Sequence, residues 1–90
     1  MLNTLESLFK LARERKSSPV DGSYTNKLLN DKSLSKAKVL EEINELIEAV
    51  EKDSNKIHEA ADVLYHLIVY FEANEIKIED VVAELEKRKK

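Results

Sequence analysis

Apolar residues recur along this chain at intervals of three and four, the spacing that places them on one face of an α-helix. Polar stretches at residues 17–22 and 53–55 interrupt the pattern, and Asn30 and Asp31 interrupt it again. We therefore expect an all-α fold. The expected helices cover residues 3–16, 24–29, a stretch that starts between Ser33 and Ser35 and ends at Lys52, residues 56–73, and residues 78–88.

The third and fourth expected helices form the organising unit. Only a few residues join them, so they must lie antiparallel as a helical hairpin. The fourth helix carries apolar residues around most of its circumference, more than one short chain can cover. We therefore predict a homodimer in which two antiparallel hairpins, each with short flanking helices, pair into a four-helix-bundle core. The positions expected to face inward are Val39, Leu40, Ile43, Leu46, Ile47, Val50, Ile57, Ala60, Ala61, Leu64, Leu67, Ile68 and Phe71.

The composition supports this fold class and the need for a partner copy. One glycine and one proline leave few of the turns that β-hairpins require. The 90 residues suffice for one domain over residues 1–90, and the absence of cysteine excludes disulfides. Because so short a chain buries only a small core, oligomerisation is the remaining route to stability.

Charge and hydropathy exclude two classes of partner. The formal net charge is −3 with 37% charged residues, so the concentrated basic excess of a nucleic-acid-binding protein is missing. The longest apolar stretch, residues 63–71, is far shorter than the roughly 20 residues of a membrane span. Residues 1–10 lack the basic and then apolar order of a secretion signal. We therefore expect a cytoplasmic protein without a nucleic-acid or membrane partner.

Acidic residues occur in pairs on the two hairpin helices. Glu42 and Glu45 are three residues apart, as are Glu59 and Asp62, so each pair shares one helix face, and His66 follows one turn later. Such pairs are often solvated surface, but the apolar flanks of the fourth helix indicate a polar cleft. Clustered carboxylates in a cleft need a compensating cation. Oxygen ligands without cysteine favour Mg²⁺, with Mn²⁺ as a substitute.

The spacing of these acids resembles the metal motif of the all-α nucleoside triphosphate pyrophosphohydrolases, the MazG-like superfamily. Within it, Ser23-Tyr24-Thr25 and the run Glu-Ala-Ala-Asp-Val-Leu-Tyr-His at residues 59–66 are similar to the phosphoribosyl-ATP pyrophosphohydrolases of histidine biosynthesis. The similarity extends over nearly the whole chain. Asp31, Ala37 and Leu40 depart from the family pattern, whereas every acidic position is retained.

The resemblance implies hydrolysis of the α–β phosphoanhydride of phosphoribosyl-ATP to phosphoribosyl-AMP and pyrophosphate. Mg²⁺ would bridge phosphate oxygens and lower the pKa of the attacking water. The implied metal ligands are Glu42, Glu45, Glu59 and Asp62, and Glu41 is a candidate to accept the proton of the water. Phosphoribosyl-AMP cyclohydrolase, which acts next, is a candidate partner.

Further residues are candidates for binding the substrate, and each has a structural alternative. Basic residues near a helix end also stabilise the helix dipole, a serine or threonine also caps a helix, and Lys38 also pairs with Glu42. His66 is expected to orient a carboxylate or to fill the core rather than to bind metal. The substrate-binding candidates are Arg13, Arg15, Lys16, Ser23, Tyr24, Thr25 and Lys38.

Two other functions remain open from the sequence alone. A broader MazG-like enzyme would hydrolyse ordinary or damaged nucleoside triphosphates with the same metal and water, and only contacts to base and sugar would differ. A non-catalytic helical dimerisation module would carry the same acids as solvated surface. Binding of Mg²⁺ separates the enzymes from the module.

Overall fold

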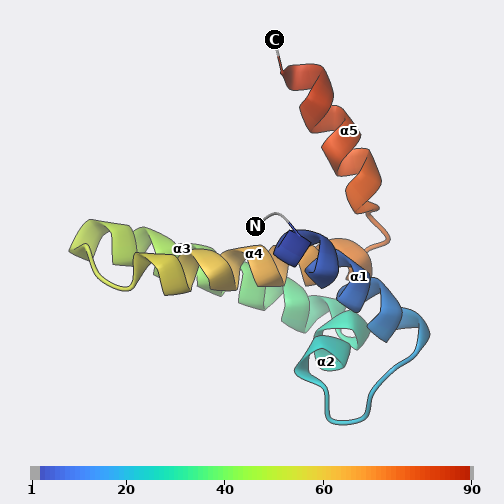
Figure 1. The fold of residues 1–90 in the computed structure, drawn as a ribbon. Helices are drawn as coiled ribbons and strands as arrows, with labels where there is room; N and C mark the ends of the chain where they lie inside the picture. Colours follow the sequence, from blue (N-terminus) through green and yellow to red (C-terminus); the bar gives the residue numbers. More distant parts are fainter. Residues whose placement is uncertain (1–2, 90) are drawn as a thin grey trace.

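The structure is a computed structural model that describes residues 3–89. This part of the chain contains five helices and no strand, which confirms the predicted all-α fold (Figure 1). The helices are α1 (Asn3–Ser17), α2 (Tyr24–Asn30), α3 (Lys32–Lys52), α4 (Lys56–Ala73) and α5 (Ile78–Arg88).

Side-chain caps fix where α2 and α3 begin. Ser23 caps α2, and its hydroxyl accepts a hydrogen bond from the backbone N–H of Asn26. Asp31 caps α3, and its carboxylate accepts from the N–H of Leu34 at 3.0 Å. Because of that cap, α3 begins at Lys32, slightly before the predicted start.

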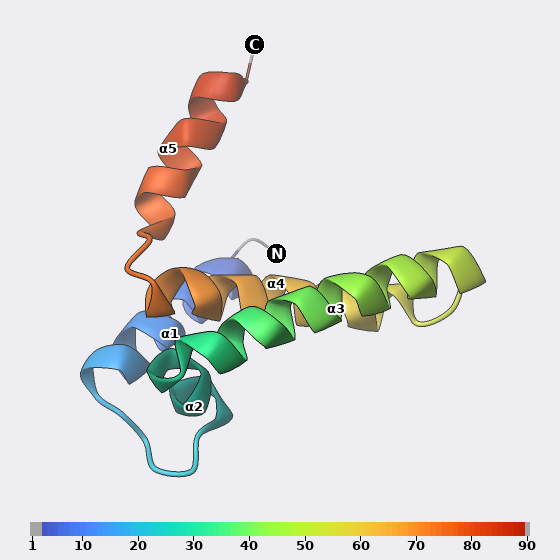
Figure 2. The ribbon, with the colours of Figure 1, turned by 180° about the vertical axis from the view of Figure 1, so that it is seen from behind.

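Helices α3 and α4 lie side by side and antiparallel, as predicted (Figures 1 and 2). Asp53 and Asn55, in the turn between them, have left-handed φ angles of 52° and 61°. Asp and Asn tolerate this conformation better than other non-glycine residues. The N–H of Ser54 donates to the carbonyl of Ala49 at 3.0 Å, which closes the C-terminus of α3. The hairpin therefore turns without a glycine.

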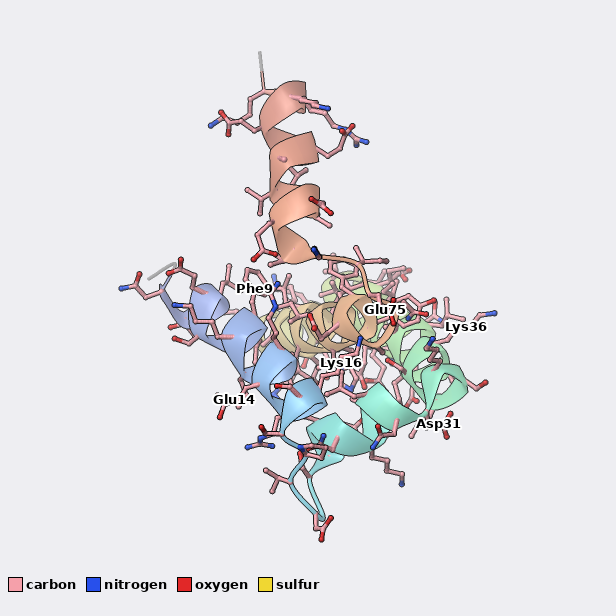
Figure 3. The ribbon with its side chains drawn as sticks, turned by 90° about the vertical axis from the view of Figure 1, so that its right-hand side faces the viewer. Phe9, Glu14, Lys16, Asp31, Lys36 and Glu75 are labelled. Atoms are coloured by element: carbon pink, nitrogen blue, oxygen red, sulfur yellow. The ribbon has the colours of Figure 1, made fainter. Side chains whose placement is uncertain are left out.

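The core lies at one end of the hairpin, where α1 and α2 both pack against α4 (Figure 3). Leu28 and Leu29 of α2 contact Val69 and Ala73 of α4, and all four side chains are buried. Leu34 and Tyr65 pack around this cluster. The short helix α2 is thus held in place next to the C-terminal half of α4.

Within one chain, part of the apolar surface that was expected to face inward is exposed, in keeping with the prediction that one chain cannot cover it. Helices α1 and α2 cover only one end, so apolar residues nearer the turn have nothing to pack against. Ile57 is 88% exposed. The other exposed positions that were expected to face inward are Leu40, Ile47, Val50, Ala61 and Leu64.

Helix α5 projects away from the other helices (Figures 1 and 2), and none of its residues is buried. Val82 and Leu85 on its apolar side are about half exposed. Among the described residues, no helix combines the length and apolar character needed to cross a bilayer.

Candidate active site

The hairpin brings the predicted acidic residues into one region. Two groups of side chains each place their ligand atoms within 4.8 Å of one another. Helix α3 contributes the first group, and the first turns of α4 contribute the second. The groups are Glu41, Glu42 and Glu45, and His58, Glu59 and Asp62.

Glu45 links the two groups electrostatically. Burial raises the pKa of Glu42, which is only 6% exposed, and the carboxyl group of Glu45 raises that pKa further. Burial also raises the pKa of Glu59, and Glu45 and then Asp62 add to the effect. Because Glu45 on α3 affects the pKa of Glu59 on α4, and Asp62 on α4 affects the pKa of Glu42 on α3, the two groups face each other across the hairpin. Glu42, Glu45, Glu59 and Asp62 are called the carboxylate cluster below.

Two oxygen atoms in this cluster have no hydrogen-bond partner among the described residues. These buried atoms are Oε2 of Glu42 and Oε2 of Glu59. A buried carboxylate oxygen without a partner is unfavourable, and a cation relieves both the desolvation and the mutual repulsion. Carboxylates from two helices, with an imidazole at the edge, are a donor set that suits Mg²⁺ or Mn²⁺. The residues present therefore fit a divalent cation.

Lys38 and Glu41 lie at the edge of the cluster. The Lys38 ammonium is 3.1 Å from Glu41 and 3.9 Å from Glu42. The ion pair expected as the structural alternative for Lys38 is therefore present, although the nearer partner is Glu41. The hydrogen bond to Glu41 raises the pKa of Lys38, which holds its positive charge beside the acids. Glu41 itself is exposed.

The hydroxyls of the Ser23-Tyr24-Thr25 motif all bond within the chain. Arg15 donates to the hydroxyl of Ser23 at 2.7 Å. The hydroxyl of Tyr24 is 3.0 Å from His66 Nε2, and that of Thr25 pairs with the hydroxyl of Tyr65. The motif thus caps α2 and connects it to α4, on the side where Tyr24 approaches the carboxylate cluster.

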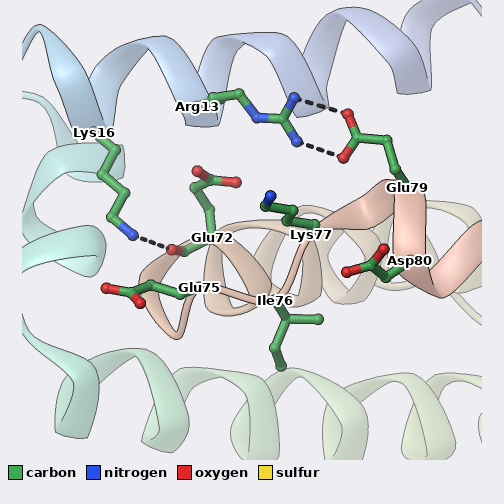
Figure 4. A pocket seen from close by; sticks show the side chains of 8 residues that line it. All are labelled: Arg13, Lys16, Glu72, Glu75, Ile76, Lys77, Glu79 and Asp80. Atoms are coloured by element: carbon green, nitrogen blue, oxygen red, sulfur yellow. Dashed lines mark hydrogen bonds and ion pairs between the residues drawn. The ribbon is translucent and has the colours of Figure 1, made fainter.

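Arg13 and Lys16 lie away from the carboxylate cluster. Figure 4 shows them beside Glu79 and Glu72 instead. Arg13 makes a two-pronged ion pair with Glu79 of α5, at 2.8 and 2.9 Å, and Lys16 donates to the backbone carbonyl of Glu72 at 2.9 Å. Along the axis of α4, Glu72 lies about 15 Å from Asp62, the nearest acid of the cluster on that helix. Arg13 and Lys16 line a hollow of about 650 Å³ between α1 and the start of α5. Within one chain, the structure does not bring them to the acids.

Three side chains near the site were missed in the sequence. His58 Nε2 lies 3.4 Å from Asp62, and the four-residue spacing of the two on one helix would have indicated this contact. Asn26 is buried; its amide donates to the carbonyl of Arg15 and accepts from the N–H of Val20, which fixes the loop before α2. Tyr65 holds Thr25. No helical spacing marks the last two, because the partners of Asn26 lie across the loop before α2 and the partner of Tyr65 lies 40 residues away.

Comparison with known proteins shows the family of this chain. A family model described as phosphoribosyl-ATP pyrophosphohydrolase matches residues 2–89. A phosphoribosyl-ATP pyrophosphatase of Clostridium acetobutylicum is 44% identical over 93% of this chain and 79% of its own length. One from Methanococcoides burtonii is 38% identical over 98% of this chain and 94% of its own length. The histidine biosynthesis bifunctional protein HisIE of Pyrococcus furiosus is 40% identical over 99% of this chain but 43% of its own length. The resemblance noted in the sequence is confirmed, and the chain belongs to the phosphoribosyl-ATP pyrophosphohydrolase family.

Proposed function

We propose that Glu42, Glu45, Glu59 and Asp62 hold the Mg²⁺ with which this enzyme hydrolyses the α–β phosphoanhydride of phosphoribosyl-ATP. The observation that carries the proposal is the pair of buried, unpartnered oxygens on Glu42 and Glu59, with Glu45 between their helices. Bound by these residues, Mg²⁺ would neutralise negative charge on the substrate phosphates and would make an attacking water more acidic. Mn²⁺, which accepts the same ligands, is expected to substitute.

Glu41 and Lys38, at the edge of the cluster, have separate roles in the reaction. Glu41 is exposed and next to the cluster, so it accepts the proton that the water loses as its oxygen bonds to phosphorus and the anhydride bond breaks. Lys38 holds a positive charge at the same edge and contacts a phosphate of the substrate. A substrate phosphate competes with Glu41 for Lys38, which frees the Glu41 carboxylate.

The remote ribose phosphate of the substrate is assigned to the Arg15 side. Arg15 contacts Ser23, and the next residue, Tyr24, reaches the turn that carries Asp62. By binding the remote phosphate, the Arg15 guanidinium orients the substrate far from the reacting phosphorus, and this binding energy stabilises the transition state. Arg13 and Lys16 are the weaker candidates, because their head groups are engaged with α5 and with the end of α4.

We propose in addition that the active molecule is a homodimer. The exposed apolar residues of α3 fall at 40, 47 and 50, with the partly buried Ile43 between them, and those of α4 fall at 57, 61 and 64. Both sets follow the alternating three- and four-residue spacing of helix-bundle seams. A second copy presents the same seams and would complete a four-helix bundle.

Two further proposals concern the cellular context. The bifunctional Pyrococcus relative matches this chain over less than half of its length, so it carries additional sequence. We propose that phosphoribosyl-AMP cyclohydrolase is the functional partner of this chain, because it consumes the product. A cytoplasmic location is proposed because the substrate is a soluble nucleotide and the chain has no cysteine.

The direct test is incubation with phosphoribosyl-ATP and Mg²⁺, followed by identification of the products. We expect phosphoribosyl-AMP and pyrophosphate in equal amounts, and neither product when Mg²⁺ is chelated. Release of inorganic phosphate instead would contradict cleavage at the α–β bond. Equal kcat/KM for phosphoribosyl-ATP, ATP and dCTP would favour a broad nucleoside triphosphate pyrophosphohydrolase.

A further inference from the structure

A chain of hydrogen bonds connects α2 with the turn of α4 that carries Asp62. The hydroxyl of Tyr24 is 3.0 Å from His66 Nε2, and His66 Nδ1 is 2.7 Å from the backbone carbonyl oxygen of Asp62. A carbonyl oxygen only accepts, so Nδ1 carries the proton of the neutral imidazole. Nε2 then accepts the proton of the Tyr24 hydroxyl.

Packing leaves the His66 ring little freedom to adopt another orientation. His66 is 6% exposed, and its ring meets the edges of both neighbouring tyrosine rings, with centroids 5.8 Å from Tyr24 and 5.0 Å from Tyr65. The two tyrosine rings stack on each other at 6.3 Å. His66 also lies close to the carboxyl group of Glu42. The ring is therefore fixed between the aromatic cluster and the carboxylate cluster.

We propose that Tyr24 is a positioning residue for the metal site: its hydroxyl fixes His66, and His66 fixes the α4 turn at Asp62. This inference rests on the proposed metal site. It gives Tyr24 a role different from the substrate contact expected from the sequence, because the proton of its hydroxyl is already donated within the chain.

The physical basis is the geometric demand of a cation bound by two helices. Mg²⁺ requires near-ideal octahedral geometry, so small rotations of one ligand-bearing turn weaken binding. Removing the Tyr24 hydroxyl leaves the buried Nε2 of His66 without its donor, so the bond that selects the tautomer with the proton on Nδ1, and with it the bond from Nδ1 to the Asp62 carbonyl, is lost. The turn at Asp62 loses a restraint, while every carboxylate remains present.

The test is a titration of the protein with Mn²⁺ in the absence of substrate. Binding is measured from the electron paramagnetic resonance signal of the free ion. Tyr24→Phe keeps the ring and removes one oxygen atom. We expect it to weaken Mn²⁺ binding by about 3- to 10-fold, the range of one net hydrogen bond. Tyr65→Phe is the matched control, since it removes the same atom from the same cluster but from the bond to Thr25. We expect Mn²⁺ binding by this control to stay within about 2-fold of wild type.

A double-mutant comparison separates positioning from general damage. His66→Asn retains an amide that reaches the Asp62 carbonyl but removes the atom that accepts from Tyr24. Tyr24→Phe should then have no further effect on Mn²⁺ binding in that background.

Three outcomes would overturn the positioning role. The first is Mn²⁺ affinity unchanged in Tyr24→Phe while KM for phosphoribosyl-ATP rises, which would make Tyr24 a substrate contact. The second is an equal loss in the Tyr65→Phe control. The third is a wild-type protein that binds no Mn²⁺, which would also remove the proposed metal site, whereas the first two would leave that site standing.

Discussion

Glu45 on α3 and Glu59 on α4 meet across the hairpin. Burial raises the pKa of Glu59, and the carboxyl group of Glu45 raises it further. Two carboxylates placed so close repel each other unless a cation lies between them. The metal-free protein therefore keeps a destabilising arrangement at its site, which is typical of residues arranged for binding rather than for stability.

Removal of one buried charge should stabilise the metal-free protein. Glu42→Gln keeps the shape of the side chain and removes an oxygen that lacks a partner. We expect a gain of about 1 kcal/mol, or about 4 to 8 °C in Tm, in the presence of a chelator. Thermal unfolding followed by circular dichroism measures this shift. Wild-type protein should gain more from added Mg²⁺ than the variant, and a lower Tm of the variant in chelator would contradict the prediction.

Catalysis should depend on each carboxylate of the cluster. Asp62→Asn and Glu45→Gln retain size and hydrogen-bonding shape but remove an anionic ligand atom. We expect kcat/KM for phosphoribosyl-ATP to fall about 100-fold or more, with unchanged helical content. Glu48→Gln is a suitable control, because Glu48 lies on the same helix but pairs with Lys52 at 2.5 Å. Wild-type turnover by either site variant would refute its role as a ligand.

The apolar seam should determine the oligomeric state. Ile47→Glu places a charge in the middle of the exposed apolar row of α3, where pairing with a second copy would bury it. Light scattering at micromolar concentration should report a dimer for wild type and a monomer for this variant. A charge reversal off the seam, Glu48→Lys, should leave the dimer intact. A wild-type monomer would defeat the prediction.

The contact between α1 and α5 should depend on pH in a defined direction. The hydrogen bond from Arg13 lowers the pKa of Glu79 from 4.5 to about 2. A carboxyl group with a lowered pKa contributes stability above its unfolded pKa and loses it as pH falls towards the folded value. The difference in Tm between wild type and Glu79→Gln should therefore be present at pH 7 and shrink from pH 4.5 to pH 2. Because the pair is exposed, the difference should be small and should decrease in high salt. A difference that grows on acidification would contradict the assignment.

Substrate choice should depend on Arg15 more than on Arg13. If Arg15 binds the remote phosphate, Arg15→Gln should lower kcat/KM for phosphoribosyl-ATP about 10- to 150-fold and leave the slower reaction with ATP nearly unchanged. Arg13→Gln removes the same charge from the pair with Glu79 and should have a much smaller effect. Equal losses on both substrates would indicate a structural role for Arg15.

The sequence predicted those features that depend on local periodicity. The hairpin and the grouping of Glu42 and Glu45 with Glu59 and Asp62 follow from helical spacing plus a short turn. The start of α3 was misplaced because a single capping side chain, Asp31, decides it.

Contacts between distant residues were not predictable. Apolar spacing predicted more apolar surface on the fourth helix than one chain can cover, but it did not specify which residues, such as Ile57, a single chain leaves exposed. The pairing of Arg13 with Glu79 and the bond between Tyr24 and His66 join residues from different helices. Such contacts depend on how helices pack, which single-helix patterns do not contain.

Calorimetric titration of Mg²⁺ into wild-type protein and into Glu45→Gln tests the central claim most directly. Glu45 is the carboxylate that acts on both helices, so its charge should be needed for a single site shared between them. We predict saturable binding by wild type and a loss of binding of about 10-fold or more in the variant. Absent binding in wild type, or equal binding in both proteins, would contradict a metal site that depends on Glu45.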